Sequence, residues 1–76
     1  MIRILLFAQL KDQVGENKLL LDYQPLSVAD LKKQMQDRYK FQTKDVMVAI
    51  NEEYAADYDM IHDGDVVAMI PPVSGG

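Results

Sequence analysis

The 76-residue sequence has no cysteine, no tryptophan and a single histidine. Without cysteine the chain has no disulfide, no thiolate ligand for zinc and no side-chain thiol that could carry sulfur. Long apolar runs are also missing, because ILLFA at residues 4–8 is too short to span a membrane or to form the core of a secretion signal. We therefore expect a cytoplasmic protein without a metal site.

Positive charge is scarce as well. Eight lysines and arginines face twelve aspartates and glutamates, which gives a net charge of −4. An acidic surface argues against nucleic acid and anionic membranes as partners and is compatible with a basic protein partner. Apolar residues make up 49% of the chain, enough to support the core of one small domain.

The first apolar segment, IRILLFA at residues 2–8, predicts a strand. Arg3 cannot be buried without a partner, so it marks the outward face, and alternation places Leu5 and Phe7 on that same face. The side chains predicted to point inward are those of Ile2, Ile4 and Leu6. The polar residues 9–16 predict a loop with room for one helical turn.

The remaining elements complete an α+β domain. Ser27 with Asp30 resembles a capping box and precedes an apolar stripe, which predicts an amphipathic helix within residues 25–41. Strands are predicted at 17–23, at 46–51, near Tyr54 and at 66–70. One main helix would cover one face of a small mixed sheet, with a body at residues 1–70 and an extended tail at 71–76.

The single histidine, His62, lies beside Asp63 and Asp65 in the acidic turn 57–65. A calcium loop is excluded because Ile61 stands where an oxygen ligand is required. No second histidine or cysteine completes a ligand set, so we interpret His62 as a solvated turn residue.

No catalytic constellation is visible. Ser27 is a helix cap, and Ser74 has no base near it in sequence, so an acyl-transfer triad is not expected. Lys32 and Lys33 are interpreted as a solvated helix face. We therefore expect a protein that is not an enzyme by itself.

The sequence ends PPVSGG, residues 71–76. Pro71 and Pro72 favour an extended backbone and end the preceding strand. Gly75 and Gly76 have no Cβ, so the terminus can enter a channel too narrow for other residues. A stiff spacer with a slim tip indicates a probe for the active site of another protein.

At this point the sequence resembles a known family. The segment DGDVVAMIPPVSGG at 63–76 is similar to the end of the small, sulfur-carrying subunits of molybdopterin synthase. Residues 1–15, 27–34 and 46–55 also resemble that family, so the similarity covers nearly the whole chain. The resemblance implies a ubiquitin-like β-grasp fold in which Gly76 carries the chemistry.

The resemblance also implies partners. An adenylyltransferase would use ATP to convert the carboxylate of Gly76 to an acyl-adenylate, and a sulfur donor protein would replace the adenylate to leave a thiocarboxylate. The large synthase subunit would then use this sulfur to build the dithiolene of molybdopterin. Family synthases pair two small with two large subunits. ATP is used with the activating enzyme, and we expect no bound cofactor.

By the same resemblance, a docking surface should surround the root of the tail. Phe7, Tyr54 and Ile70 are the candidates on the sheet face away from the helix. The tail residues expected to bind the partner are Pro71, Pro72, Val73, Ser74 and Gly75. The alternative is that Phe7 or Ile70 completes the core, because a register error of one residue reverses the two faces.

Three other functions remain open. A thiamine-pathway sulfur carrier also ends in Gly-Gly, but its tail usually lacks Pro-Pro-Val, so Pro71 and Pro72 argue against it. A ubiquitin-like modifier joined to lysines would share the terminal chemistry as far as the adenylate. The third alternative is an interaction domain with an inert tail.

Overall fold

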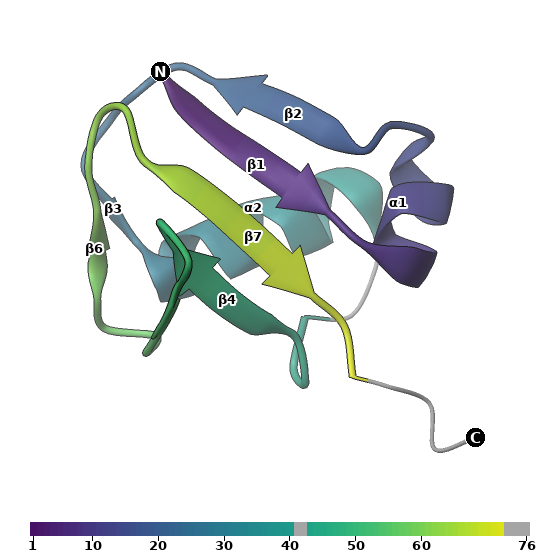
Figure 1. The fold of residues 1–76 in the computed structure, drawn as a ribbon. Helices are drawn as coiled ribbons and strands as arrows, with labels where there is room; N and C mark the ends of the chain where they lie inside the picture. Colours follow the sequence, from purple (N-terminus) through teal and green to yellow (C-terminus); the bar gives the residue numbers. More distant parts are fainter. Residues whose placement is uncertain (41–42, 73–76) are drawn as a thin grey trace.

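A five-stranded mixed sheet forms the centre of the fold (Figure 1). In spatial order its strands are β2 (Lys18–Leu21), β1 (Ile2–Leu6), β7 (Val66–Ile70), β4 (Met47–Ile50) and β5 (Glu53–Ala55). The computed structural model describes residues 1–40 and 43–72. Strand β1 runs parallel to the central strand β7, and every other pair in this sheet is antiparallel.

Helix α2 (Val28–Tyr39) covers one face of the sheet. It buries Val28, Leu31 and Met35, the apolar stripe expected from its sequence. The capping box is present: the hydroxyl of Ser27 accepts from the Asp30 N–H, and the Asp30 carboxylate accepts from the Ser27 N–H, both at 3.1 Å. These bonds satisfy backbone donors that no helical carbonyl can reach, so the cap sets the start of the helix.

The core lies between α2 and the sheet. Alternation along β1 is as predicted, since Ile2, Ile4 and Leu6 are buried whereas Arg3 is exposed. The other buried apolar side chains include Leu26, Val46, Val48, Ile61, Val67 and Met69. The expected packing of one main helix on one face of a small mixed sheet is thus observed.

The loop expected at residues 9–16 is wrong in part, because a second helix, α1 (Ala8–Val14), occupies most of it. Leu10 anchors this helix by being buried, and Gly15 ends it in the left-handed conformation at φ 87°. The strand expected at 2–8 correspondingly stops at Leu6. Glycine suits this end because it has no Cβ to clash at positive φ.

A two-stranded sheet that the sequence did not predict closes the side of the fold. It pairs β3 (Leu26–Ser27) with β6 (Met60–Ile61) antiparallel. Both strands are two residues long, too short to show alternation. The pairing buries Leu26 and Ile61 and joins the start of α2 to the acidic turn.

The acidic turn also contacts α2 directly. Lys32, expected to be fully solvated, is half-buried, and its ammonium lies 2.9 Å from the Asp57 carboxylate. That interpretation was therefore wrong for Lys32, whereas Lys33 is exposed. Asp59 accepts a hydrogen bond from the Ala56 N–H at 2.8 Å, which closes the turn.

Candidate functional site: the tail root and the outer sheet face

The tail begins at the end of the central strand β7. Ile70 is the last residue of that strand, and Pro71 is buried, which adds one residue of the expected tail to the packed body. Pro72 is exposed. The predicted tail residues Val73, Ser74, Gly75 and Gly76 lie outside the described residues.

A cleft of about 290 Å³ lies beside the tail root. Its lining combines α1, the segment before β4 and the two prolines: Gln9, Leu10, Gln13, Asp45, Val46, Pro71 and Pro72. Leu10 and Val46 are themselves buried core residues. Helix α1 therefore flanks the point where the tail leaves the body, and Pro71 is held by packing rather than by ladder hydrogen bonds.

Register determines which side chains share the outer face, the sheet face away from α2. Leu5 lies opposite Ala68, Ala68 opposite Ala49, and Ala49 opposite Tyr54. Arg3 and Leu5 lie on the outward side of β1, so this whole row is outward. Because Ala68 and Ala49 have small side chains, the surface is lower in the middle of the row than at Leu5 and Tyr54.

A second row lies at the tail root. Met47 pairs with Ile70 across β4 and β7. Phe7 directly follows β1, whose last residue Leu6 pairs with Met69, so Phe7 continues the same row on the far side of β7. We call Phe7, Met47, Tyr54 and Ile70 the outer patch.

The outer patch is accessible to solvent. The exposed fractions are 45% for Phe7, 51% for Met47 and 71% for Tyr54, and Ile70 is partly buried. The alternative in which Phe7 or Ile70 completes the core is therefore excluded. Both side chains point outward, as predicted. Their role in binding a partner stays a prediction. Apolar side chains grouped in this way on a small domain are typical of a protein–protein interface.

Met47 was missed by sequence reasoning. It lies between the buried Val46 and Val48, in a segment that read simply as an apolar strand. Alternation was the signal that could have found it, since a strand residue flanked by two inward neighbours points outward.

The described residues offer no alternative catalytic site. His62 is exposed, and its Nδ1 lies 3.8 Å from Oδ2 of Asp65. That carboxylate oxygen already accepts the His62 N–H at 2.8 Å, so it closes the turn. Within residues 1–40 and 43–72 no group of three acidic or histidine side chains could hold a metal ion. In the same residues no helix is long and apolar enough to cross a membrane.

The fold and the tail root define a ubiquitin-like domain of the β-grasp type. Similarity of its sequence to known proteins identifies the family. Residues 4–76 match the model of the ThiS family, so the chain belongs to that family. It is 37% identical to the molybdopterin synthase sulfur carrier subunit of Dictyostelium discoideum, over 97% of this chain and 94% of the relative. It is 32% identical to the subunit of that name from Escherichia coli (strain K12), over 100% of both chains.

Solved structures confirm the predicted fold. SAMP1 from Haloferax volcanii is 25% identical and superposes with a TM-score of 0.80 over 99% of this chain and 98% of that one. A putative molybdopterin converting factor subunit 1 from Pyrococcus furiosus is 24% identical, with a TM-score of 0.78 over 95% and 97%. In a complex of subunits 1 and 2 of the molybdopterin-converting factor from Helicobacter pylori 26695, one chain is 19% identical with a TM-score of 0.67, over 99% and 97%.

Proposed function

We propose that the chain is a sulfur carrier in molybdenum cofactor biosynthesis and that Gly76 bears the sulfur as a thiocarboxylate. The observation that carries the proposal is the position of Ile70, which is both the last residue of β7 and a member of the outer patch. A surface that surrounds the root of a Gly-Gly tail can hold the body while the tip reacts elsewhere. The sulfur carrier subunits that match over the full length support the same function.

The chemistry requires an activated terminus, because a free carboxylate is a poor electrophile. An adenylyltransferase would join the Gly76 carboxylate to the α-phosphate of ATP and release pyrophosphate. A hydrosulfide equivalent from a sulfur donor protein would attack the acyl carbon and displace AMP, leaving a thiocarboxylate. No oxidation or reduction of the acyl carbon is needed in either step. The chain has no cysteine, so the terminus replaces a side-chain thiol as the sulfur nucleophile.

The acceptor site is proposed to belong to a large synthase subunit. The outer patch would hold the carrier in one orientation, so that the tail enters the active site with its tip at the pterin substrate. Fixing both reactants in this way raises their effective concentration. The complex of subunits 1 and 2 from Helicobacter pylori supports a partner of this kind. Two small with two large subunits is the assembly we expect.

A second candidate function is that of a protein modifier. The similarity to SAMP1, named in another structure a small archaeal modifier protein, favours it. A modifier would share the adenylation step and would then form an amide with a lysine of another protein instead of donating sulfur. The difference lies in the fate of the acyl group.

Intact mass distinguishes these fates. The chain would be purified from cells that contain or lack the adenylyltransferase, and its mass measured under mild conditions. Replacement of one oxygen by sulfur, only when the adenylyltransferase is present, would support the sulfur carrier. Covalent adducts on other proteins without any sulfur-containing form would support the modifier instead. An unchanged mass in both strains would contradict both functions.

A further inference from the structure

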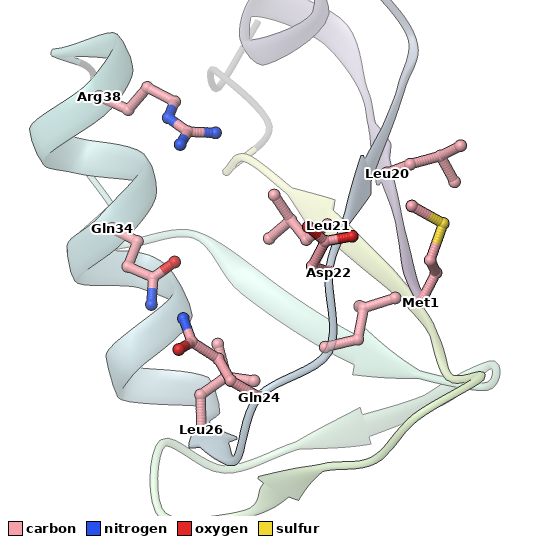
Figure 2. A pocket seen from close by; sticks show the side chains of 9 residues that line it. Met1, Leu20, Leu21, Asp22, Gln24, Leu26, Gln34 and Arg38 are labelled. Carbon is pink, nitrogen blue, oxygen red and sulfur yellow. The ribbon is translucent and has the colours of Figure 1, made fainter.

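The outer face of the sheet carries positive charge, although the chain as a whole is acidic. Arg3 lies on the outward side of β1, opposite Leu20 of β2. Lys18, at the start of β2, lies opposite Leu5 and therefore points outward as well. Figure 2, which views the groove between β2 and α2, shows Leu20 directed away from the helix and its neighbour Leu21 directed towards it. We call Arg3 and Lys18 the cationic pair.

Among the strand residues that the structure describes, no carboxylate shares this face with the cationic pair. The remaining outward strand positions are all uncharged: Leu5, Leu20, Met47, Ala49, Tyr54, Val66, Ala68 and Ile70. The acidic residues that flank β2 in the sequence, Glu16 and Asp22, lie outside the strand. The net charge of −4 is therefore carried by other surfaces, and the outer face is a positive exception.

The cationic pair has no partner within residues 1–40 and 43–72. Both side chains are exposed, and neither takes part there in an ion pair or a side-chain hydrogen bond. Lys32 differs from them, because the Asp57 carboxylate holds its ammonium at 2.9 Å. An unpaired guanidinium or ammonium beside apolar side chains can bind a carboxylate that another protein brings.

The apolar surface of the outer patch continues as far as the cationic pair. Leu20 has 54% of its surface exposed, and Leu5 and Val66 are partly buried. Arg3 pairs with Val66, the first residue of β7, whereas Ile70 is the last residue of that strand and lies at the tail root. These two positions are four residues apart on one strand, roughly 13 Å. The face therefore has an apolar end at the tail root and a positive end away from it.

We propose that the cationic pair binds carboxylates of the large synthase subunit and so makes a second contact beyond the outer patch. The inference rests on the proposed function, because that function assigns the outer patch to this subunit. The Arg3 guanidinium would donate two parallel hydrogen bonds to one carboxylate, and the Lys18 ammonium would lie beside the same carboxylate or an adjacent one. The matching surface of the subunit is then apolar around the tail root and acidic at the far end.

Two separate contacts fix the orientation of the body, whereas one does not. An apolar contact at the tail root alone would allow the body to turn about the tail, because hydrophobic attraction has no direction. A charged contact at the far end of the face would prevent this rotation and would also steer the encounter of the two proteins. The basic partner that the net charge of the whole chain favours would be repelled on this face, so the cationic pair also discriminates between partners.

The test is binding of the purified large subunit to charge variants of this chain at low and high salt. Arg3→Gln should weaken binding about two- to fivefold, and Arg3→Glu at least about tenfold, because it places like charges together. Lys18→Glu should act in the same direction, and each loss should shrink at high salt. Lys33→Glu is the matched control, since Lys33 is exposed on α2. It makes the same change in net charge on another face and should bind like the unaltered chain.

Thermal melts of each variant keep the outcome independent of folding, and Arg3→Gln serves if Arg3→Glu does not fold. Failure of the unaltered chain to bind the large subunit would contradict the proposed function and the inference with it. Binding that Phe7→Glu weakens, but that Arg3→Glu and Lys18→Glu leave unchanged, would overturn the inference alone. Equal weakening by Lys33→Glu would have the same consequence, because it would show an effect of net charge only. Tighter binding of Arg3→Glu would also overturn it, since the subunit would then present a basic group at this end.

Discussion

Met47 and Ile70 lie directly opposite each other on β4 and β7, and both belong to the face that α2 does not cover. This pair links the exposed outer face to the root of the tail, because the chain passes from Ile70 straight into the two prolines. A partner that covers Met47 and Ile70 must therefore contact the tail root as well.

A charge on the outer patch should separate binding from folding. Phe7→Glu is expected to leave the melting temperature nearly unchanged, because the side chain is already accessible to water. The same change should weaken binding to a large synthase subunit, since a carboxylate would be desolvated only in the complex. Thermal melts and binding titrations measure the two effects.

Ile4→Glu is the matched control on the same strand, because Ile4 is fully buried. It should cost roughly 3 kcal/mol or more and unfold much of the protein. If Phe7→Glu and Ile70→Glu both fold and bind like the unaltered chain, the outer patch is not the docking surface.

The tip should tolerate nothing larger than glycine. Gly76→Ala, deletion of Gly76 or addition of one residue is expected to abolish sulfur transfer while the fold is kept, because the terminus is the reacting group. Mass spectrometry would measure formation of the thiocarboxylate, and a purified assay would measure sulfur transfer to the pterin. Sulfuration by a chain with an extra residue, with no trimming seen by mass, would contradict the terminal mechanism.

The hairpin between β4 and β5 offers a stabilising substitution. Asn51 and Glu52 form its two-residue turn with φ values of 50° and 71°. This conformation costs less for asparagine than for glutamate, and Asn-Gly is the preferred pair in such turns. Glu52→Gly should therefore raise stability by about 1 kcal/mol, or roughly 4–8 °C in melting temperature. Glu52→Ala, which keeps the Cβ, is the control and should bring no such gain.

The acidic residues of the turn should differ in their effect on stability. The Asp65 side chain is 15% exposed and accepts hydrogen bonds from the His62 N–H at 2.8 Å and from the Asn51 amide at 3.0 Å. Asp65→Ala should therefore cost about 1–3 kcal/mol. Asp57 is 66% exposed, and its loss should cost less than about 1 kcal/mol despite the pair with Lys32. Unfolding of both variants in denaturant measures these changes in the free energy of unfolding. Equal decreases for the two variants would contradict the predicted ranking.

The elements predicted correctly from the sequence are those with a clear local pattern, such as alternation or a capping motif. Alternation around Arg3 gave the two faces of β1, and the Ser27–Asp30 capping box gave the start of α2. Helix α1 was not predicted, because Leu10 is its only buried residue and Phe7 supplies no side-chain cap. Neither apolar periodicity nor a capping motif therefore marks this helix in the sequence. Its start even requires Ala8 at a positive φ of 51°, which local preference opposes.

The site was predictable to a similar degree. Alternation placed Phe7 on the outer face, as observed, whereas the working role of the Pro-Pro and Gly-Gly tail stays a prediction. Burial of Pro71 could not be read from the sequence, because it depends on α1 and Val46 arriving from other parts of the chain. Met47 became recognisable only through its register with Ile70.

The tail is attached to the central strand of the sheet, with β1 on one side and β4 on the other. A pull on the tail, as when it is drawn into an active site, loads both hydrogen-bonded ladders of β7 in shear. The edges can fray without loosening this anchor, because local opening in proteins begins where contacts are few. We therefore expect resistance to such a pull to depend on both ladders of β7, so that under the proposed function the domain keeps its fold while its tail is engaged.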